Sequence, residues 1–185
     1  MMKNKIRKDM KAKRKALSRE EVEEKSRMAA RFFLESEVYK KSKVLMVYMP
    51  LGNETDTKDI IESAFRDGKQ LVLPSTDSET GIITPVIFNK DATFEKGGFA
   101  VYEPINPTIA HKSMIDTVIV PGIAFGEDGS RVGFGKGCYD MFLEGMNVVR
   151  VGFCYEFQMC DSIPVNEHDI KMDFLVTEKG MVAAG

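Results

Sequence analysis

The sequence has few of the residues that crosslink small proteins, and it lacks the long apolar segments that anchor proteins in membranes. It contains no tryptophan, two histidines and three cysteines among 185 residues. Because the cysteines are odd in number and form no CxxC pair, the sequence predicts neither a disulfide framework nor a structural zinc site. No apolar run approaches the roughly 20 residues that a membrane helix needs, and the charged N-terminus does not resemble a signal peptide. We therefore expect a cytoplasmic protein that has no membrane partner.

The length and the hydrophobic content favour one globular domain. Hydrophobic residues make up 43% of the chain, and a chain of this size buries about 70% of the surface that its unfolded form exposes. No internal repeat or low-complexity linker divides the sequence. We expect a single domain over residues 1–185.

Charge is distributed unevenly along the chain. Residues 1–15 carry eight Lys or Arg and one acid, Asp9, whereas the remaining 170 residues carry 18 basic and 27 acidic side chains. A basic arm on an acidic body favours a polyanionic ligand, although a lysine-rich helix that merely faces solvent gives the same pattern. The acidic body and the absence of aromatic residues from the arm argue against nucleic acid. A small phosphorylated ligand fits better.

The hydrophobic pattern predicts helices that alternate with strands. A basic amphipathic helix is expected at about 3–17, on the helical spacing of Ile6, Met10, Arg14 and Leu17. Ser18 followed by Glu21 is a capping-box pattern that starts a second helix. Further helices are expected near 60–65 and 138–145, and strands at 44–49, 71–74, 117–120, 148–153 and 174–176. This alternation predicts a three-layer α/β/α sandwich with a mostly parallel sheet.

The stretch 121–140 carries the most chemical information. It follows a strand, precedes a helix and contains six glycines. Gly133, Gly135 and Gly137 leave room for backbone amides to approach an anion. Lys136 would neutralise a phosphate and Arg131 would grip it through its planar guanidinium, both from a loop expected at the surface. The pattern predicts a phosphate cradle.

This stretch does not match the common nucleotide motifs. A Walker loop needs glycine where Ser130 stands and Ser or Thr where Gly137 stands, and Cys138 takes the place of the third glycine of a dinucleotide fingerprint. A glycine-rich turn without a ligand therefore stays open as an interpretation.

Residues 131–140, Arg-Val-Gly-Phe-Gly-Lys-Gly-Cys-Tyr-Asp, resemble the Arg-x-Gly-x-Gly-x-Gly-Tyr-Tyr-Asp signature of 5-formyltetrahydrofolate cyclo-ligases. Residues 3–7 resemble the Lys-x-x-Leu-Arg element of that family, and residues 164–169 resemble its Pro-x-x-x-x-Asp element. The resemblance implies an enzyme that uses ATP and Mg²⁺ to close 5-formyltetrahydrofolate to 5,10-methenyltetrahydrofolate. It implies phosphorylation of the formyl oxygen and release of ADP and phosphate, with no nucleic acid and no obligate protein partner.

The resemblance also implies roles for individual residues. Lys136 and Arg131 would be catalytic, and Asp140 and Asp169 would hold the metal. The implied ATP contacts are Lys3, Asn4, Lys5, Ile6, Arg7, Arg131, Val132, Gly133, Phe134, Gly135, Lys136, Gly137, Cys138 and Tyr139. The implied folate contacts are Met49, Glu54, Phe134, Gly135, Lys136, Gly137 and Cys138. The chain departs from the signature at Cys138, which replaces its first tyrosine.

Other interpretations stay open at this point. Asp140 at a helix start also complements the helix dipole, and Asp169 also suits a turn. Glycine-rich phosphate loops recur in unrelated chemistries, so another enzyme that uses ATP or a sugar phosphate is the first alternative. A nucleic-acid or nucleotide-binding module that relies on the basic arm is the second.

Overall fold

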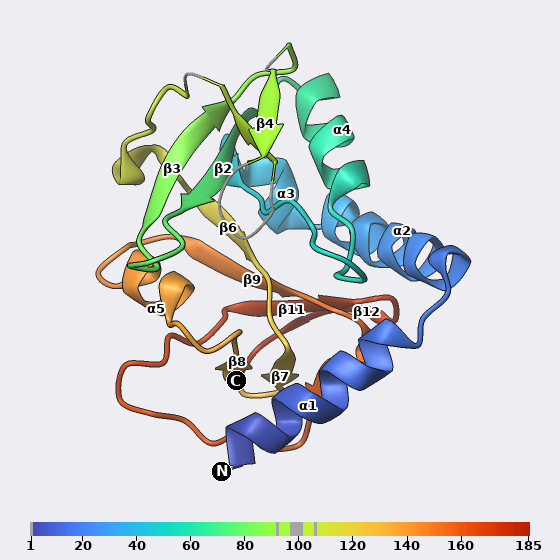
Figure 1. The fold of residues 1–185 in the computed structure, drawn as a ribbon. Helices are drawn as coiled ribbons and strands as arrows, with labels where there is room; N and C mark the ends of the chain where they lie inside the picture. The colour runs from blue at the N-terminus through green and yellow to red at the C-terminus, as the bar shows by residue number, and fades with distance from the viewer. Residues whose placement is uncertain (1, 92, 97–101, 106) are drawn as a thin grey trace.

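The computed structural model describes residues 2–91, 93–96, 102–105 and 107–185, and a seven-stranded sheet runs through its centre (Figure 1). Its strand order is β12-β11-β9-β6-β1-β2-β3. The two outermost pairs, β2 with β3 and β11 with β12, are antiparallel, and all inner neighbours are parallel. The strands are β1 (Val44–Met46), β2 (Gln70–Thr76), β3 (Ile83–Phe88), β6 (Thr117–Val120), β9 (Val149–Phe153), β11 (Phe174–Thr177) and β12 (Gly180–Ala183).

Helices form where the sequence pattern predicts them. The capping box is present, because the Ser18 hydroxyl accepts from the Glu21 amide and the Glu21 carboxylate accepts from the Ser18 amide. Ser36 then ends one helix and caps the next, a break that was not predicted. The helices are α1 (Met2–Lys15), α2 (Arg19–Glu35), α3 (Glu37–Lys41), α4 (Lys58–Arg66) and α5 (Cys138–Leu143), with 3-10 turns at Lys112–Met114 and Glu156–Gln158.

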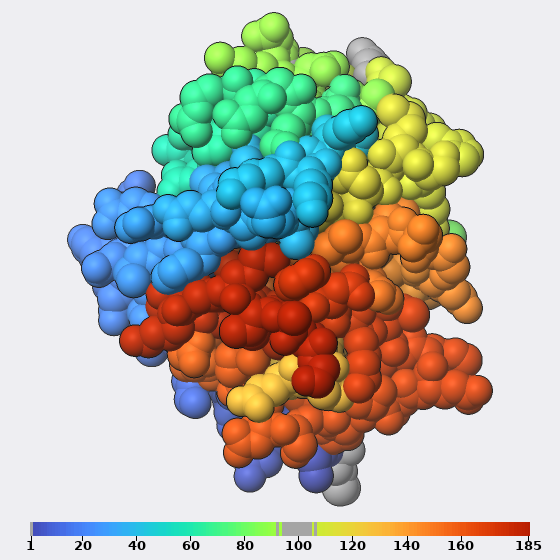
Figure 2. Space-filling view, turned by 180° about the vertical axis from the view of Figure 1, so that it is seen from behind, coloured from blue at the N-terminus to red at the C-terminus, as the bar shows by residue number. Residues whose placement is uncertain are grey.

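The sheet is covered on both faces, as the alternation of helices and strands predicts. Successive strand residues point to opposite faces. Leu45 therefore joins the apolar cluster that holds Phe33 of α2, whereas Met46 joins the cluster that holds Phe142 of α5. From behind, the C-terminal strands in red lie against α2 and α3 in light blue (Figure 2). The three-layer α/β/α prediction is confirmed.

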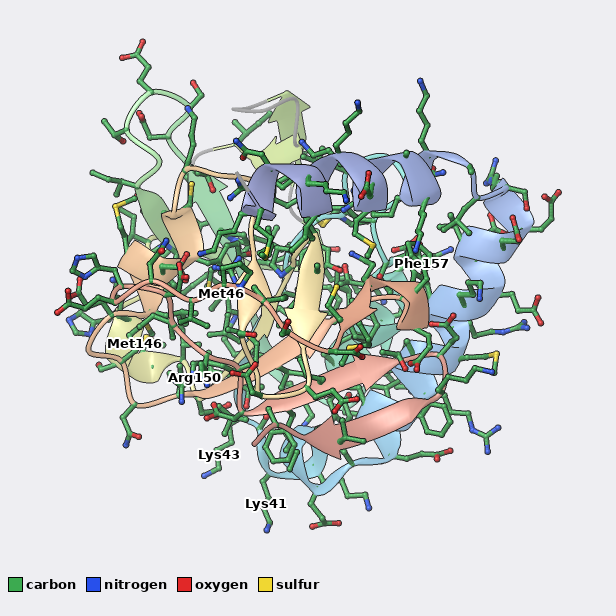
Figure 3. All side chains as sticks on the ribbon, turned by 90° about the horizontal axis from the view of Figure 1, so that it is seen from below. Lys41, Lys43, Met46, Met146, Arg150 and Phe157 are labelled. Carbon is green, nitrogen blue, oxygen red and sulfur yellow. The ribbon has the colours of Figure 1, made fainter. Side chains whose placement is uncertain are left out.

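A small second sheet places the basic arm beside the glycine-rich stretch. It consists of β10 (Met159–Cys160), β7 (Ala124–Gly126) and β8 (Arg131–Val132). In the view from below, α1 crosses one side of the molecule, and Lys43 and Arg150 lie on the opposite side (Figure 3). Met10 of α1 packs into an apolar cluster with Ile123 and Val132. The remaining pair, β4 (Phe94–Lys96) and β5 (Tyr102–Pro104), forms a separate ribbon.

Two predictions of local structure differ from the fold. The strand expected at 44–49 is assigned only to Val44–Met46, although the Val47 amide still donates to the Val72 carbonyl at 2.9 Å. The stretch expected to be a loop contains the hairpin β7–β8, which turns at Gly129 with φ +82°. Among the helices of the described residues, none is long and apolar enough to cross a membrane.

Candidate active site

The residues that follow β8 form an open turn that leads into α5. Gly135 has φ +121° and Gly137 has φ +68°. Both lie in the region that favours glycine, because a Cβ there clashes with the backbone. A Cβ built on Gly137 would meet no atom within 4 Å, so this backbone faces open space. The turn therefore leaves room for a ligand to approach its backbone at Gly137, as a phosphate cradle requires.

Arg131 is buried, which corrects the expectation that it lies on an exposed loop. Its side chain is 5% exposed, and its guanidinium donates to the Asp140 carboxylate at 3.0 Å and to the Pro121 carbonyl at 3.2 Å. The burial follows from the hairpin, because β8 pairs with β7 and is packed under α1. The second Asp140 oxygen accepts from the Ile170 amide at 3.1 Å. Arg131 thus joins the cradle, the start of α5 and the chain near residue 170.

Lys136 lies at the exposed tip of the same turn. Its ammonium donates to the Ser78 carbonyl at 2.6 Å, in the turn that joins β2 to β3. A Cβ on Gly81 would lie 3.2 Å from the Cys138 sulfur, so this turn also packs against Cys138. Lys136 lines the cavity wall, and its long, flexible side chain can reach an anion in the cavity.

The basic arm meets the cradle directly. Lys3 forms an ion pair with Asp169, and the Arg7 guanidinium donates to the Gly133 carbonyl at 2.8 Å. Asn4 accepts a hydrogen bond from Arg7 at 2.7 Å and so holds that side chain. Other members of the predicted contact set lie differently: Lys5 is exposed, and Ile6 and Val132 pack in the apolar cluster around Met10. The arm is therefore a docked element rather than a solvated helix.

A cavity of about 300 Å³ lies between the cradle and the end of β1. Of the predicted folate contacts, Gly135 alone is absent from its wall. The wall consists of Tyr48, Met49, Leu51, Glu54, Pro74, Thr76, Pro121, Arg131, Gly133, Phe134, Lys136, Gly137, Cys138, Tyr139 and Asp140. This site lies beyond the carboxyl ends of β1, β2 and β6, where ligands of parallel sheets bind.

Glu54 brings a buried carboxylate to the wall of the same cavity. It is 6% exposed and accepts from the Leu51 amide at 2.9 Å, and its other oxygen lies 3.6 Å from the Arg14 guanidinium. Burial raises the pKa of Glu54, while the Leu51 amide and Arg14 oppose that rise. The carboxylate is therefore suited to a ligand that donates hydrogen bonds, such as a pterin ring.

Tyr139 contributes a hydroxyl without a partner. The hydroxyl is buried and makes no hydrogen bond to any described residue, and burial raises the pKa of the phenol. A buried donor without an acceptor costs about 1–3 kcal/mol. Because Tyr139 lines the cavity, a bound ligand that offers an acceptor would recover this cost.

The two predicted metal ligands lie in one neighbourhood and are bound to cations of the chain. Asp140 pairs with Arg131, and Asp169 pairs with Lys3 and accepts from the Asn166 amide at 2.7 Å. No cluster of three or more potential ligands from His, Cys, Asp or Glu occurs in the described part of the chain. Magnesium usually takes one or two carboxylates and completes its shell with substrate phosphates and water. The pair fits a magnesium–nucleotide complex and does not fit a metal held by protein alone.

Arg14 was not among the predicted site residues, although it contacts two residues of the cavity wall. Its guanidinium reaches Glu54 and lies 5.9 Å from the centre of the Phe134 ring. The signal was present, because Arg14 follows Ile6 and Met10 at helical spacing on the face of α1 that turns inward. Tyr48, Pro74 and Thr76 of the wall carry no comparable signal, since they belong to ordinary strand ends.

A family profile described as the 5-formyltetrahydrofolate cyclo-ligase family matches residues 1–178. The chain belongs to this family. The predicted resemblance, based on the cradle, the arm and residues 164–169, is confirmed.

Curated relatives and solved structures agree with this placement. The mouse 5-formyltetrahydrofolate cyclo-ligase is 26% identical over 94% of this chain and 92% of its own length, and the Escherichia coli K12 enzyme of that name is 27% identical over 89% and 94%. The 5,10-methenyltetrahydrofolate synthetase structure from Aquifex aeolicus is 33% identical, has a TM-score of 0.86 and covers 99% of this chain and 93% of its own. The Mycoplasma pneumoniae synthetase, 24% identical with a TM-score of 0.78 over 96% and 99%, supports the fold.

Proposed function

We propose that this enzyme carries out the ATP-dependent cyclisation of 5-formyltetrahydrofolate to 5,10-methenyltetrahydrofolate in the cavity between Glu54 and Lys136. Family membership assigns the reaction. The observation that supports its location is one cavity whose wall contains both a buried carboxylate and a glycine cradle with a lysine. The carboxylate suits the pterin, and the cradle suits the transferring phosphoryl group.

The chemistry explains why ATP is needed. The carbonyl of an N-formyl amide is a poor electrophile, and its oxygen is a poor leaving group. Transfer of the terminal phosphoryl of ATP to the formyl oxygen releases ADP and makes that oxygen a phosphate ester. The neighbouring folate nitrogen then attacks the formyl carbon and loses its proton, and the C–O bond breaks as inorganic phosphate leaves. Positioning and charge stabilisation are what the protein must supply.

The residues of the cradle supply the charge stabilisation. Lys136 would leave the Ser78 carbonyl for the transferred phosphoryl group, because a phosphate oxygen is a stronger acceptor than a carbonyl. Arg131 acts from its buried position by holding Asp140 and by adding positive charge to the cavity wall. The amides from Gly133 to Gly137 would hold the remaining phosphates, and Lys3 and Arg7 would close over them from the arm.

We propose Mg²⁺ as the metal, held by Asp140 and Asp169 together with phosphate oxygens. When bound, such an ion would neutralise charge on the nucleotide. Arg131 and Lys3 hold these two carboxylates close to the cradle. We also propose the cytoplasm as the compartment, because Cys138, Cys154 and Cys160 are free thiols, as reducing conditions favour.

The phosphoryl transfer is tested by labelling the formyl oxygen with oxygen-18. If that oxygen attacks ATP, the label appears in the inorganic phosphate, which mass spectrometry detects. Label that stays out of the phosphate while methenyl-folate forms would overturn phosphorylation of the formyl oxygen and leave the overall reaction in place. Unlabelled substrate in oxygen-18 water serves as the control for exchange.

A further inference from the structure

Helix α1 contacts both the cradle, which we propose holds the nucleotide, and the loop of Glu54, which we propose holds the folate. Near its start, Lys3 pairs with Asp169 and Arg7 donates to the Gly133 carbonyl at 2.8 Å, at the nucleotide end. Near its end, Arg14 lies 3.6 Å from the Glu54 carboxylate, at the folate end. A helix of 14 residues is about 20 Å long. One helix therefore connects the cradle to the loop that carries Glu54.

The contacts of Arg14 tie this helix to the folate side of the cavity. Its side chain is 11% exposed, and that of Glu54 is 6% exposed, so this pair is shielded from solvent far more than a surface ion pair. The Arg14 carbonyl also accepts from the Asn53 amide group at 2.9 Å, and the same group donates to the Leu17 carbonyl at 3.0 Å. The loop that carries Glu54 is thus fixed to the C-terminal end of α1 by a side-chain contact and a backbone contact.

The cradle meets the same residue from the other direction. Phe134 lies in the turn between Gly133 and Gly135, and the Arg14 guanidinium lies 5.9 Å from the centre of its ring. The Lys11 ammonium lies 5.8 Å from the same centre. Phe134 and Glu54 both line the cavity. The Arg14 guanidinium therefore lies close to Phe134 of the cradle and to Glu54 of the loop that follows β1.

This arrangement has an energetic consequence. Each substrate that binds against α1, or against residues that α1 holds, restricts the docked arm. A second substrate then finds the arm already ordered and loses less conformational entropy, which is positive cooperativity. Such coupling is reciprocal, so nucleotide must tighten folate binding by the same factor by which folate tightens nucleotide binding.

We propose that Arg14 is a positioning residue that couples the binding of folate to the binding of nucleotide through α1. This inference rests on the proposed function, because it takes the two ligands to be 5-formyltetrahydrofolate and ATP. It assigns to Arg14 the orientation of Glu54 and Phe134 and leaves the chemical step to the cradle.

The test measures equilibrium binding of 5-formyltetrahydrofolate by calorimetry, with and without a non-hydrolysable ATP analogue and Mg²⁺. The quantity of interest is the ratio of the two dissociation constants. In the unaltered protein we expect at least about a fivefold ratio, the lower end of typical coupling. In Arg14→Gln we expect a ratio near one, and in Arg14→Lys, which keeps the charge, we expect an intermediate ratio.

Controls separate coupling from a purely structural role. Lys15→Gln removes a neighbouring exposed charge of the same helix and must keep the ratio of the unaltered protein. Asn53→Ala removes the hydrogen bond from the Asn53 side chain to the Arg14 carbonyl. It must reduce the ratio even if Arg14→Gln fails to fold. If Arg14 only supports the fold, both dissociation constants rise together and the ratio stays, which overturns the proposal. A ratio near one in the unaltered protein also overturns it, while failed oxygen-18 transfer would count against the phosphorylation step alone.

Discussion

Lys136 and Arg131 carry the same formal charge five residues apart, the first in the turn and the second in β8, yet they perform different tasks. Lys136 is exposed and donates to a carbonyl that a phosphate can replace, whereas Arg131 is buried against Asp140. The burial of Arg131 was not predictable from the local sequence, because it depends on the pairing of β8 with β7 and on the packing of α1. The glycines and the lysine were predictable, because their meaning depends only on adjacent residues.

We expect Lys136→Ala to lose turnover and to keep its stability. Loss of a cation at a developing phosphoryl charge costs on the order of 100-fold or more in kcat, while an exposed substitution changes the unfolding free energy by about 0.5 kcal/mol or less. Steady-state cyclisation kinetics and urea unfolding measure the two quantities. Lys179→Ala, an exposed lysine between β11 and β12, is the matched control. Turnover within threefold of the unaltered enzyme would remove Lys136 from the mechanism.

Arg131→Ala is expected to destabilise the fold as well as the reaction. It leaves the Asp140 carboxylate without its guanidinium in a mostly buried position, a loss that typically costs about 3–5 kcal/mol. Urea unfolding of Arg131→Ala, Asp140→Asn and the double variant forms a thermodynamic cycle that isolates the pair. We expect the free energy of unfolding to fall much less in the double variant than the sum of its losses in the two single variants. Additive losses would show that the pair contributes no coupling energy.

The carboxylate of Asp128 predicts how the stability of the fold changes with pH. The Lys171 ammonium and the Ser130 amide, which both donate to the carboxylate, lower the pKa of Asp128 to about 2. A lowered pKa in the folded state stabilises the fold above the unfolded value near 4, and this contribution is lost as pH falls toward 2. Asp128→Asn should therefore be less stable than the unaltered protein at pH 6 and differ less at pH 3. The stabilisation is small because the ion pair of Asp128 with Lys171 is exposed. Urea unfolding at both pH values checks this, and an equal difference at both would contradict it.

At the scale of elements, the arm and the parallel strands follow the sequence pattern most closely. The capping box and the spacing on α1 and α2 are local signals, so these helices were predicted to within a few residues. The hairpin β7–β8 was missed although Asp128-Gly129 is a hairpin turn signal. Its strands are two and three residues long, too short for an alternating pattern. The strand β12 was missed for a similar reason, since an edge strand needs few apolar residues.

Removal of residues 1–8 is expected to weaken nucleotide binding. The deletion takes away Lys3 and Arg7 but keeps Met10 in its apolar cluster, so the rest of α1 stays docked. Charge-assisted contacts of this kind are worth about 1.5–3 kcal/mol each, and we expect the KM for ATP to rise about tenfold or more. Enzyme kinetics at saturating folate measures the change. An unchanged KM would show that the docked arm takes no part in nucleotide binding.

At the scale of the whole molecule, the site depends on the order of the sheet. The strands β1, β2 and β6 are adjacent, and their carboxyl ends deliver the Glu54 loop, the Pro74 to Thr76 segment and the Pro121 stretch to one cavity. The alternation of helices and strands predicted a parallel sheet, yet it contained no information about which strands are neighbours. The cavity itself, and the contacts of Arg14 with Glu54 and Phe134 of its wall, therefore required the structure.

As a member of its family, this protein is expected to cyclise 5-formyltetrahydrofolate with hydrolysis of ATP to ADP and phosphate. The most direct measurement mixes purified protein with 5-formyltetrahydrofolate, ATP and Mg²⁺, and records methenyl-folate absorbance and phosphate release together, with each component omitted in turn. We expect both signals to rise in equal amounts and each to require the folate and ATP. A folded protein that produces neither signal with every component present would contradict the claim.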